Sequence, residues 1–384
     1  MLLPPWPYNF KLGGVAPNYR ISRPAWSPDG TQIACCFASK IIIFDQRHGL
    51  LHFRHNGDNN GNNNNNNNSN IMTPFLTLQM FAHDLIHNPT DIHLIYSPDG
   101  SLLVALTAGL DARVKICVYT TDGYYRQLQE WNLHIDWGGN SCDGRHIDIS
   151  PCSKYVAVIV DNQILLKDIN NGETIKSIVI AEHHIRKVMF CRNDDQCSIF
   201  IHLEDNETNE KSLKIWFPYD NIDNEDEDDP NTTASLIIVW EPQPPDGTFV
   251  LSHDNSMIVY REQNSITSYD DVMLYSIDND TKSATLKKSF RLAHRSPSIY
   301  FTPDDKYILY TKKKKLAFLN IKTGRDITDP IQTTYNTKQR NRMLDYNTQP
   351  RPFVYFSPAG GTIRRFLVRD NTDKFFYIAS YWER

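Results

Sequence analysis

Histidine and cysteine side chains are the groups in this sequence best suited to hold a metal ion. His183 and His184 stand together shortly before Cys191. A structural zinc site needs three or four converging ligands, and no CxxC or HExxH spacing supplies the remaining ones. The sequence therefore predicts neither a metal ion nor a cofactor.

Motifs for nucleophilic catalysis and phosphate binding are absent from the sequence. There is no GxSxG elbow for a catalytic serine and no GxxxxGK[ST] loop for a nucleotide phosphate. Carboxylates are numerous, but no two of them recur at a spacing that would pair a general acid with a general base. We therefore predict that the protein is not an enzyme.

Basic residues concentrate in the last part of the chain, which suggests a binding surface. Residues 282–384 contain 21 Lys and Arg and 8 Asp and Glu, a net charge of +13, while the preceding 281 residues carry −18. A surface of this sign attracts an acidic protein surface or a nucleic-acid backbone, especially at low salt. The side chains predicted to bind such a partner are Lys312, Lys313, Lys314, Lys315, Lys338, Arg340, Arg342 and Arg351.

These groups must be positioned by short antiparallel strands, because one turn motif divides the chain into strand-length segments. Its clearest copy is Ser27-Pro28-Asp29-Gly30. Pro28 presets φ at the first corner, Asp29 can bond the backbone two residues on, and Gly30 tolerates a positive φ. The flanking runs are rich in Ile, Val, Phe and Cys, a composition typical of buried strands.

Seven copies of the turn predict a repeat fold. They begin at Ser27, Ser97, Ser150, Cys191, Ser252, Thr302 and Ser357. The two longest intervals contain low-complexity insertions, one Asn-rich (56–70) and one acidic (220–233), which we expect to be surface insertions, the Asn-rich one disordered. Without them the period is about 40–55 residues, as in four-stranded propeller blades. The sequence predicts an all-β fold, a seven-bladed β-propeller of four-stranded antiparallel blades.

We expect one domain over residues 1–384, closed into a ring by its N-terminal strand. The expected blades span about 21–81, 92–134, 146–180, 185–240, 247–291, 298–331 and 352–382. The last range holds only three strands, so residues 8–12 are expected to add the fourth. Closure of this kind removes an unpaired sheet edge.

The repeats resemble those of WD-repeat β-propellers, which carry Gly-His before the first strand, Asp in the second turn and Trp-Asp after the third strand. Phe44-Asp45 stands in for Trp-Asp. The resemblance implies a structural hydrogen-bonding role for the residues at the other matching positions, which are His83, Asp111, His184, His294 and Trp216. The phrase Ser22–Gly30 is also similar to turns of TolB-type and prolyl-peptidase propellers.

The resemblance implies a non-enzymatic scaffold for protein–protein interactions within a larger intracellular assembly. The alternative is an RNA- or DNA-binding propeller that uses a basic face on blades 6 and 7. A third possibility is an enzyme-associated propeller of the peptidase or TolB type. No apolar run reaches membrane-spanning length and no secretory signal is visible, so we expect a protein of the cytoplasm or nucleus that contacts no membrane.

Overall fold

The computed structural model describes the strands and most of the turns that join them. The described residues are 10–12, 24–37, 40–45, 51–52, 70–72, 76–79, 91–108, 113–134, 146–181, 183–192, 197–219, 236–242, 247–262, 270–278, 281, 283–292, 299–302, 304–312, 315–327, 354–356, 363–369 and 376–382. The acidic insertion, and the Asn-rich insertion up to residue 69, lie outside these ranges. The described residues contain no helix of the length and apolarity needed to cross a membrane.

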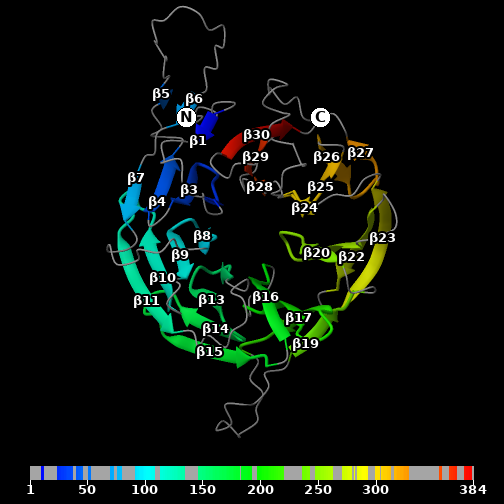
Figure 1. The fold of residues 1–384 in the computed structure, drawn as a ribbon, viewed down its shortest axis with the longest axis horizontal. Coiled ribbons are helices and arrows are strands. Elements are labelled where there is room, and N and C mark those ends of the chain that lie inside the picture. Colours follow the sequence, from blue (N-terminus) through cyan, green and yellow to red (C-terminus); the bar gives the residue numbers. More distant parts are fainter. Residues whose placement is uncertain are drawn as a thin grey trace, which may run out of the picture.

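Six four-stranded antiparallel sheets, blades 1 to 6, follow one another around a ring (Figure 1). In each blade the first strand lies nearest the centre and the last lies at the rim. Blade 1 comprises β2 (Ala25–Trp26), β3 (Gln32–Phe37), β4 (Lys40–Asp45) and β7 (Leu76–Gln79). Blade 2 comprises β8 (Asp91–Tyr96), β9 (Leu102–Ala108), β10 (Arg113–Thr120) and β11 (Gln127–His134). Blade 3 comprises β12 (Ile147–Ile149), β13 (Tyr155–Val160), β14 (Gln163–Asp168) and β15 (Thr174–Val179). Blade 4 comprises β16 (His183–Phe190), β17 (Ile199–Asp205), β18 (Lys211–Trp216) and β19 (Leu236–Trp240). Blade 5 comprises β20 (Thr248–Leu251), β21 (Met257–Glu262), β22 (Asp270–Ile277) and β23 (Ala284–Leu292). Blade 6 comprises β24 (Ile299–Phe301), β25 (Tyr307–Lys312), β26 (Lys315–Asn320) and β27 (Asp326–Ile327).

A further sheet joins the two ends of the chain. Its strands, in spatial order, are β28 (Val354–Phe356), β29 (Ile363–Arg369), β30 (Phe376–Trp382), β1 (Phe10–Leu12), β6 (Asn70–Met72) and β5 (Leu51–His52). β1 is antiparallel to β30, with Lys11 opposite Tyr377, and parallel to β6.

The all-β propeller architecture is confirmed, but the predicted set of seven four-stranded blades is wrong. Among the described residues six sheets have four strands, and the sheet at the chain ends has six. The difference arises because β5 and β6, from the long connection between β4 and β7, add to β1. No pattern of residues pointed to these two short strands, because they flank the Asn-rich tract.

Burial on both faces explains why the middle strands are apolar without alternation. Leu103 and Ala105 of β9 pack in the core between blades 1 and 2, whereas Val104 and Leu106 pack between blades 2 and 3. Successive side chains of a strand point to opposite faces, so each blade separates two cores. All four residues are fully buried.

The turn chemistry expected from the sequence is confirmed at its clearest copy. The Asp29 carboxylate accepts hydrogen bonds from Ser27 Oγ at 2.6 Å and from the Thr31 amide at 3.0 Å. The Gly30 amide donates to the Ser27 carbonyl at 2.8 Å, and Gly30 has a φ of 67°. Asp99 and Asp254 make the same pair of bonds in their own turns.

The fourth residue of several turns links neighbouring blades, through contacts that we call turn clasps. It has a positive φ even where it is not glycine: 60° at Ser153, 61° at Asn255 and 53° at Asp305. In this conformation its side chain accepts hydrogen bonds from amides in the turn of the preceding blade. The clasps join Ser153 to the Asp99 amide (3.3 Å), Asn255 to the Arg192 amide (3.3 Å), and Asp305 to the His253 and Asp254 amides (2.9 and 3.0 Å).

Candidate functional site in the central channel

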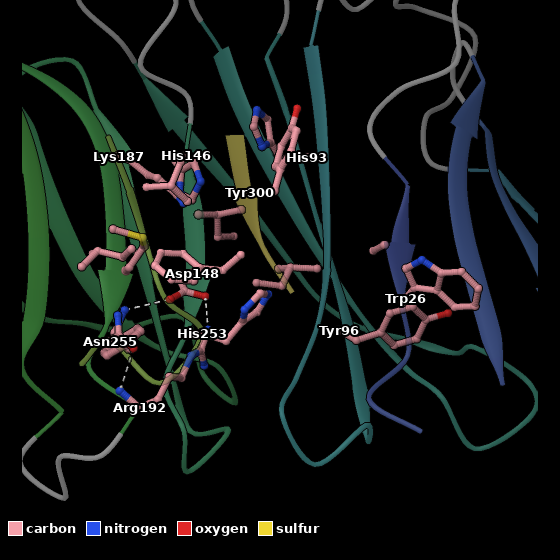
Figure 2. Close-up of a pocket in the computed structure, with 18 of the residues that line it drawn as sticks. Trp26, His93, Tyr96, His146, Asp148, Lys187, Arg192, His253, Asn255 and Tyr300 are labelled. Atoms are coloured by element: carbon pink, nitrogen blue, oxygen red, sulfur yellow. Dashed lines mark hydrogen bonds and ion pairs between the residues drawn. The ribbon is translucent and has the colours of Figure 1, made fainter. Parts of the chain in front are cut away.

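A cavity of about 530 Å³ lies at the centre of the ring, lined by the first strands of blades 1 to 6 (Figure 2). Its lining changes along the axis, because each first strand runs from one face of the ring to its turn on the other. Side chains that point away from the turns form one end of the cavity, and side chains near the turns form the other.

The first of these ends, which we call the channel mouth, is formed by His93, His146, Lys187 and Tyr300. Figure 2 shows these four side chains together at the end away from Asp148 and Arg192. The His93 and His146 rings belong to adjacent blades, with centroids 5.8 Å apart in an edge-to-face arrangement. Imidazole, ammonium and phenol groups can all donate hydrogen bonds, so the mouth can bind a carboxylate or a phosphate group.

The electrostatic environment behind the mouth is positive. His202, on the next strand of blade 4, is paired in register with Lys187. Burial, reinforced by the charges of Lys187, Lys211 and Arg186, lowers the pKa of His202 to about 3. Of these three charged residues Lys187 is the one that lines the cavity, where its ammonium group favours an anion.

At the turn end of the cavity, the polar groups bind one another. Asp148 accepts hydrogen bonds from the Phe190 amide at 2.7 Å and from Arg192 Nη2 at 2.8 Å. Arg192 Nη1 also donates to the Ile149 carbonyl at 3.0 Å. This ion pair links blade 3 to blade 4. Because Asp148 is buried and its carboxylate already accepts these bonds, it can make few further hydrogen bonds to a ligand.

The structure places part of the predicted basic surface at the same face as the channel mouth. Lys312 and Lys315 face each other across the ends of β25 and β26. Ile299, at the start of β24, is opposite Tyr310, so this hairpin end lies at the face where the first strand begins. The other predicted partner-binding residues lie outside the described residues: Lys313, Lys314, Lys338, Arg340, Arg342 and Arg351.

The residues expected to form structural networks are only partly described. His184 lies within β16 opposite Glu204, whereas Trp216 lies opposite Ile199 at the other end of blade 4, where it is buried. The structure therefore does not bring His184 and Trp216 together. His83, Asp111 and His294 lie outside the described residues.

Asp45, which stands in for the Asp of Trp-Asp, does enter a buried network. Its Oδ2 accepts from Gln32 Nε2 at 2.7 Å, and Gln32 in turn accepts from the Tyr125 hydroxyl. Tyr125 bonds Tyr96 of the same blade at 3.1 Å, so the network connects blades 1 and 2.

The sequence reasoning missed the channel mouth, although the repeat alignment contained a signal for it. His93, His146 and Lys187 each stand four residues before the first residue of a turn, and so does Arg23 in blade 1, outside the described residues. Basic or imidazole side chains thus occupy one repeat position in four consecutive blades. Within the described ranges, no group of three His, Cys, Asp or Glu side chains is arranged to hold a metal ion.

Comparison with known proteins supports the architecture. A solved structure described as "Kuenenia stuttgartiensis Hydrazine Synthase" matches 94% of this chain and 94% of its own chain, with a TM-score of 0.53 and 13% sequence identity. The shared feature is the fold. No protein-family model matches the chain, and no curated protein matches its sequence.

Proposed function

We propose that the protein is a non-enzymatic scaffold that docks an acidic segment of a partner protein at the channel mouth. The observation that carries this proposal is the convergence of His93, His146 and Lys187 at one end of the central cavity. The β25–β26 hairpin, which carries Lys312 and Lys315, ends at the same face of the ring.

The interior of the channel favours a peptide over a nucleic acid as the occupant. Beyond the mouth it is lined by apolar side chains that include Ile95, Met189 and Val250. A peptide can place a carboxylate against the mouth and an apolar side chain below it, and both contacts then contribute to affinity. A phosphate backbone would use only the positive rim.

Binding to defined probes tests this function. We expect a fluorescent peptide that alternates Glu with Leu to bind the wild-type protein, with affinity falling as salt increases. Lys187→Glu should weaken binding about tenfold, which corresponds to about 1.4 kcal/mol. Lys176→Glu makes the same charge change on the exposed outer strand of blade 3 and should leave binding unchanged.

Equal binding by wild type and Lys187→Glu would refute the docking site, provided that both proteins unfold at the same denaturant concentration. The alternative, binding of RNA or DNA, is tested in the same titration with a single-stranded oligonucleotide. Tighter binding of the oligonucleotide, abolished in Lys187→Glu, would assign the channel mouth to nucleic acid.

We further propose that the protein is a single WD-repeat-like domain whose ring is closed by its N-terminal strand. In this proposal β1 closes the ring by pairing with β30 in the sheet that joins the two ends of the chain. The antiparallel pairing of β1 with β30 supports the proposal. Deleting residues 1–14 should expose the edge of β30 and cause aggregation. A soluble deletion variant with unchanged melting would refute closure.

A further inference from the structure

Two cysteine side chains from adjacent blades approach each other on the turn face of the ring. The sulfur atoms of Cys152, in the turn of blade 3, and Cys197, two residues before the first residue of β17 in blade 4, are 4.0 Å apart. Cys152 is exposed, whereas Cys197 is buried and has a φ of 55°. A disulfide requires a sulfur–sulfur separation of about 2 Å, so the two sulfur atoms must approach each other by about 2 Å before the bond can form.

Cys152 occupies the turn position that holds an aspartate in blades 1, 2, 5 and 6. In those turns the carboxylate accepts a hydrogen bond from the hydroxyl two residues earlier, at 2.6 Å for Asp29 and 2.7 Å for Asp254. In blade 3 the Ser150 hydroxyl lies at 3.2 Å from Cys152 Sγ instead. In the other turns this hydroxyl therefore stabilises a carboxylate anion. In blade 3 the same hydroxyl is placed to stabilise a thiolate.

Hydrogen bonding makes this thiol more acidic than an ordinary cysteine. Burial alone would raise the pKa of Cys152, but bonds from Ser150, the Lys154 amide and Cys197 outweigh it and lower the pKa. The pKa of Cys117, in contrast, is raised to about 11, chiefly by burial. A thiolate is the nucleophilic form of cysteine, so Cys152 should be far more reactive than Cys117.

We propose that Cys152 is a peroxide-reactive thiol and that Cys197 resolves its oxidised form into a disulfide between blades 3 and 4. The Cys152 thiolate attacks one oxygen of hydrogen peroxide; an S–O bond forms, the O–O bond breaks, and the hydroxide that leaves takes up a proton to become water. The Cys197 sulfur then attacks the Cys152 sulfur; the S–O bond breaks, a second water leaves with the Cys197 proton, and the S–S bond forms. The two thiols lose two electrons, and one peroxide molecule accepts them. This site is independent of partner docking at the channel mouth.

Oxidation of the full-length protein with hydrogen peroxide, followed by mass spectrometry, tests the proposal. We expect an intact mass lower by two hydrogens, a proteolytic peptide pair linked through Cys152 and Cys197, and reversal by dithiothreitol. In Cys197→Ser, a diketone that traps sulfenic acids should label Cys152. A thiol-alkylating reagent should modify Cys152 at least about tenfold faster than Cys117.

Two variants restore the side chain found in the other turns and therefore serve as matched controls. Cys152→Asp should fold normally and form no crosslink, whereas Cys191→Ser, at the first position of the blade 4 turn, should still form it. The proposal is wrong if the folded wild-type protein gives no linked pair, or if the link disappears in Cys191→Ser. It is also wrong if Cys152 is trapped no faster than Cys117.

Discussion

Removal of the Asp305 carboxylate provides the most direct test of how the turns connect blades. Asp305 accepts hydrogen bonds from the amides of His253 and Asp254, at 2.9 and 3.0 Å, and from His253 Nδ1 at 3.0 Å. The side chain of Asp305 is 10% exposed, while that of His253 is 50% exposed. We therefore count the two amide bonds in full and treat the ring contact as a minor, solvent-screened contribution.

A net contribution of about 1 kcal/mol for each amide bond predicts that Asp305→Ala lowers the free energy of unfolding by about 2 kcal/mol. Asp305 has a φ of 53°, a conformation that alanine adopts at a cost and glycine adopts freely. Asp305→Gly should accordingly lose about 1 kcal/mol less than the alanine variant. Asp305→Asn keeps one oxygen acceptor at a tolerated φ and should lose about 1 kcal/mol.

Denaturant unfolding measures the loss, and hydrogen–deuterium exchange locates it. The exchange rates of the His253 and Asp254 amides should rise in Asp305→Ala, while those of the blade 2 amides should not change. The idea that turn clasps hold the blades together would be refuted by two results obtained together. The unfolding curves of all three variants would coincide with that of the wild type, and exchange at these amides would be unchanged.

Two further changes test buried contacts between strands. His202→Phe should make the free energy of unfolding less dependent on pH. The native pKa of His202, about 3, lies below the usual 6.5. Its contribution to stability is therefore fully present above pH 6.5 and is lost as the pH falls toward 3. At pH 4.5 wild type should have lost about 3 kcal/mol through this residue, and parallel curves for the two proteins from pH 7 to 4.5 would contradict the assignment. Gly172→Ala should cost about 2–3 kcal/mol, because a Cβ there would lie 2.1 Å from Trp131 Nε1 and φ is +75°. Gly123→Ala, with φ at +97° and no atom within 4 Å, is the matched control and should cost only about 1 kcal/mol, so equal losses would exclude the clash.

The order of strands could be predicted from the sequence because the turn motif carries its own chemistry. Pro28, Asp29 and Gly30 each impose a local constraint, and the structure shows both the Asp29 hydrogen bond and the positive φ of Gly30. The positive φ at Ser153 and Asp305 could not be predicted in the same way, since neither residue prefers that conformation. Hydrogen bonds to the neighbouring blade stabilise it there, and such bonds between distant residues leave no trace in local sequence.

The channel mouth illustrates the same limit for function. Lys312–Lys315 form a cluster that is visible in the sequence, whereas His93, His146 and Lys187 are each separated by more than 40 residues. They meet only because equivalent positions of successive blades converge on the ring axis. Counting charges along the chain does not reveal such a pattern. Aligning the repeats on their turns does, because equivalent positions then stand together.

In every described turn clasp the accepting side chain belongs to the later blade and the donating amide to the earlier one. During synthesis on the ribosome the chain emerges from its N-terminus, so each new turn meets a docking point that already exists. Blades 3, 5 and 6 can therefore each dock on the blade made before them, without waiting for the chain to end. A pulling force applied to the C-terminal side of blade 6 should break the turn clasps in the reverse order, beginning with the one made by Asp305.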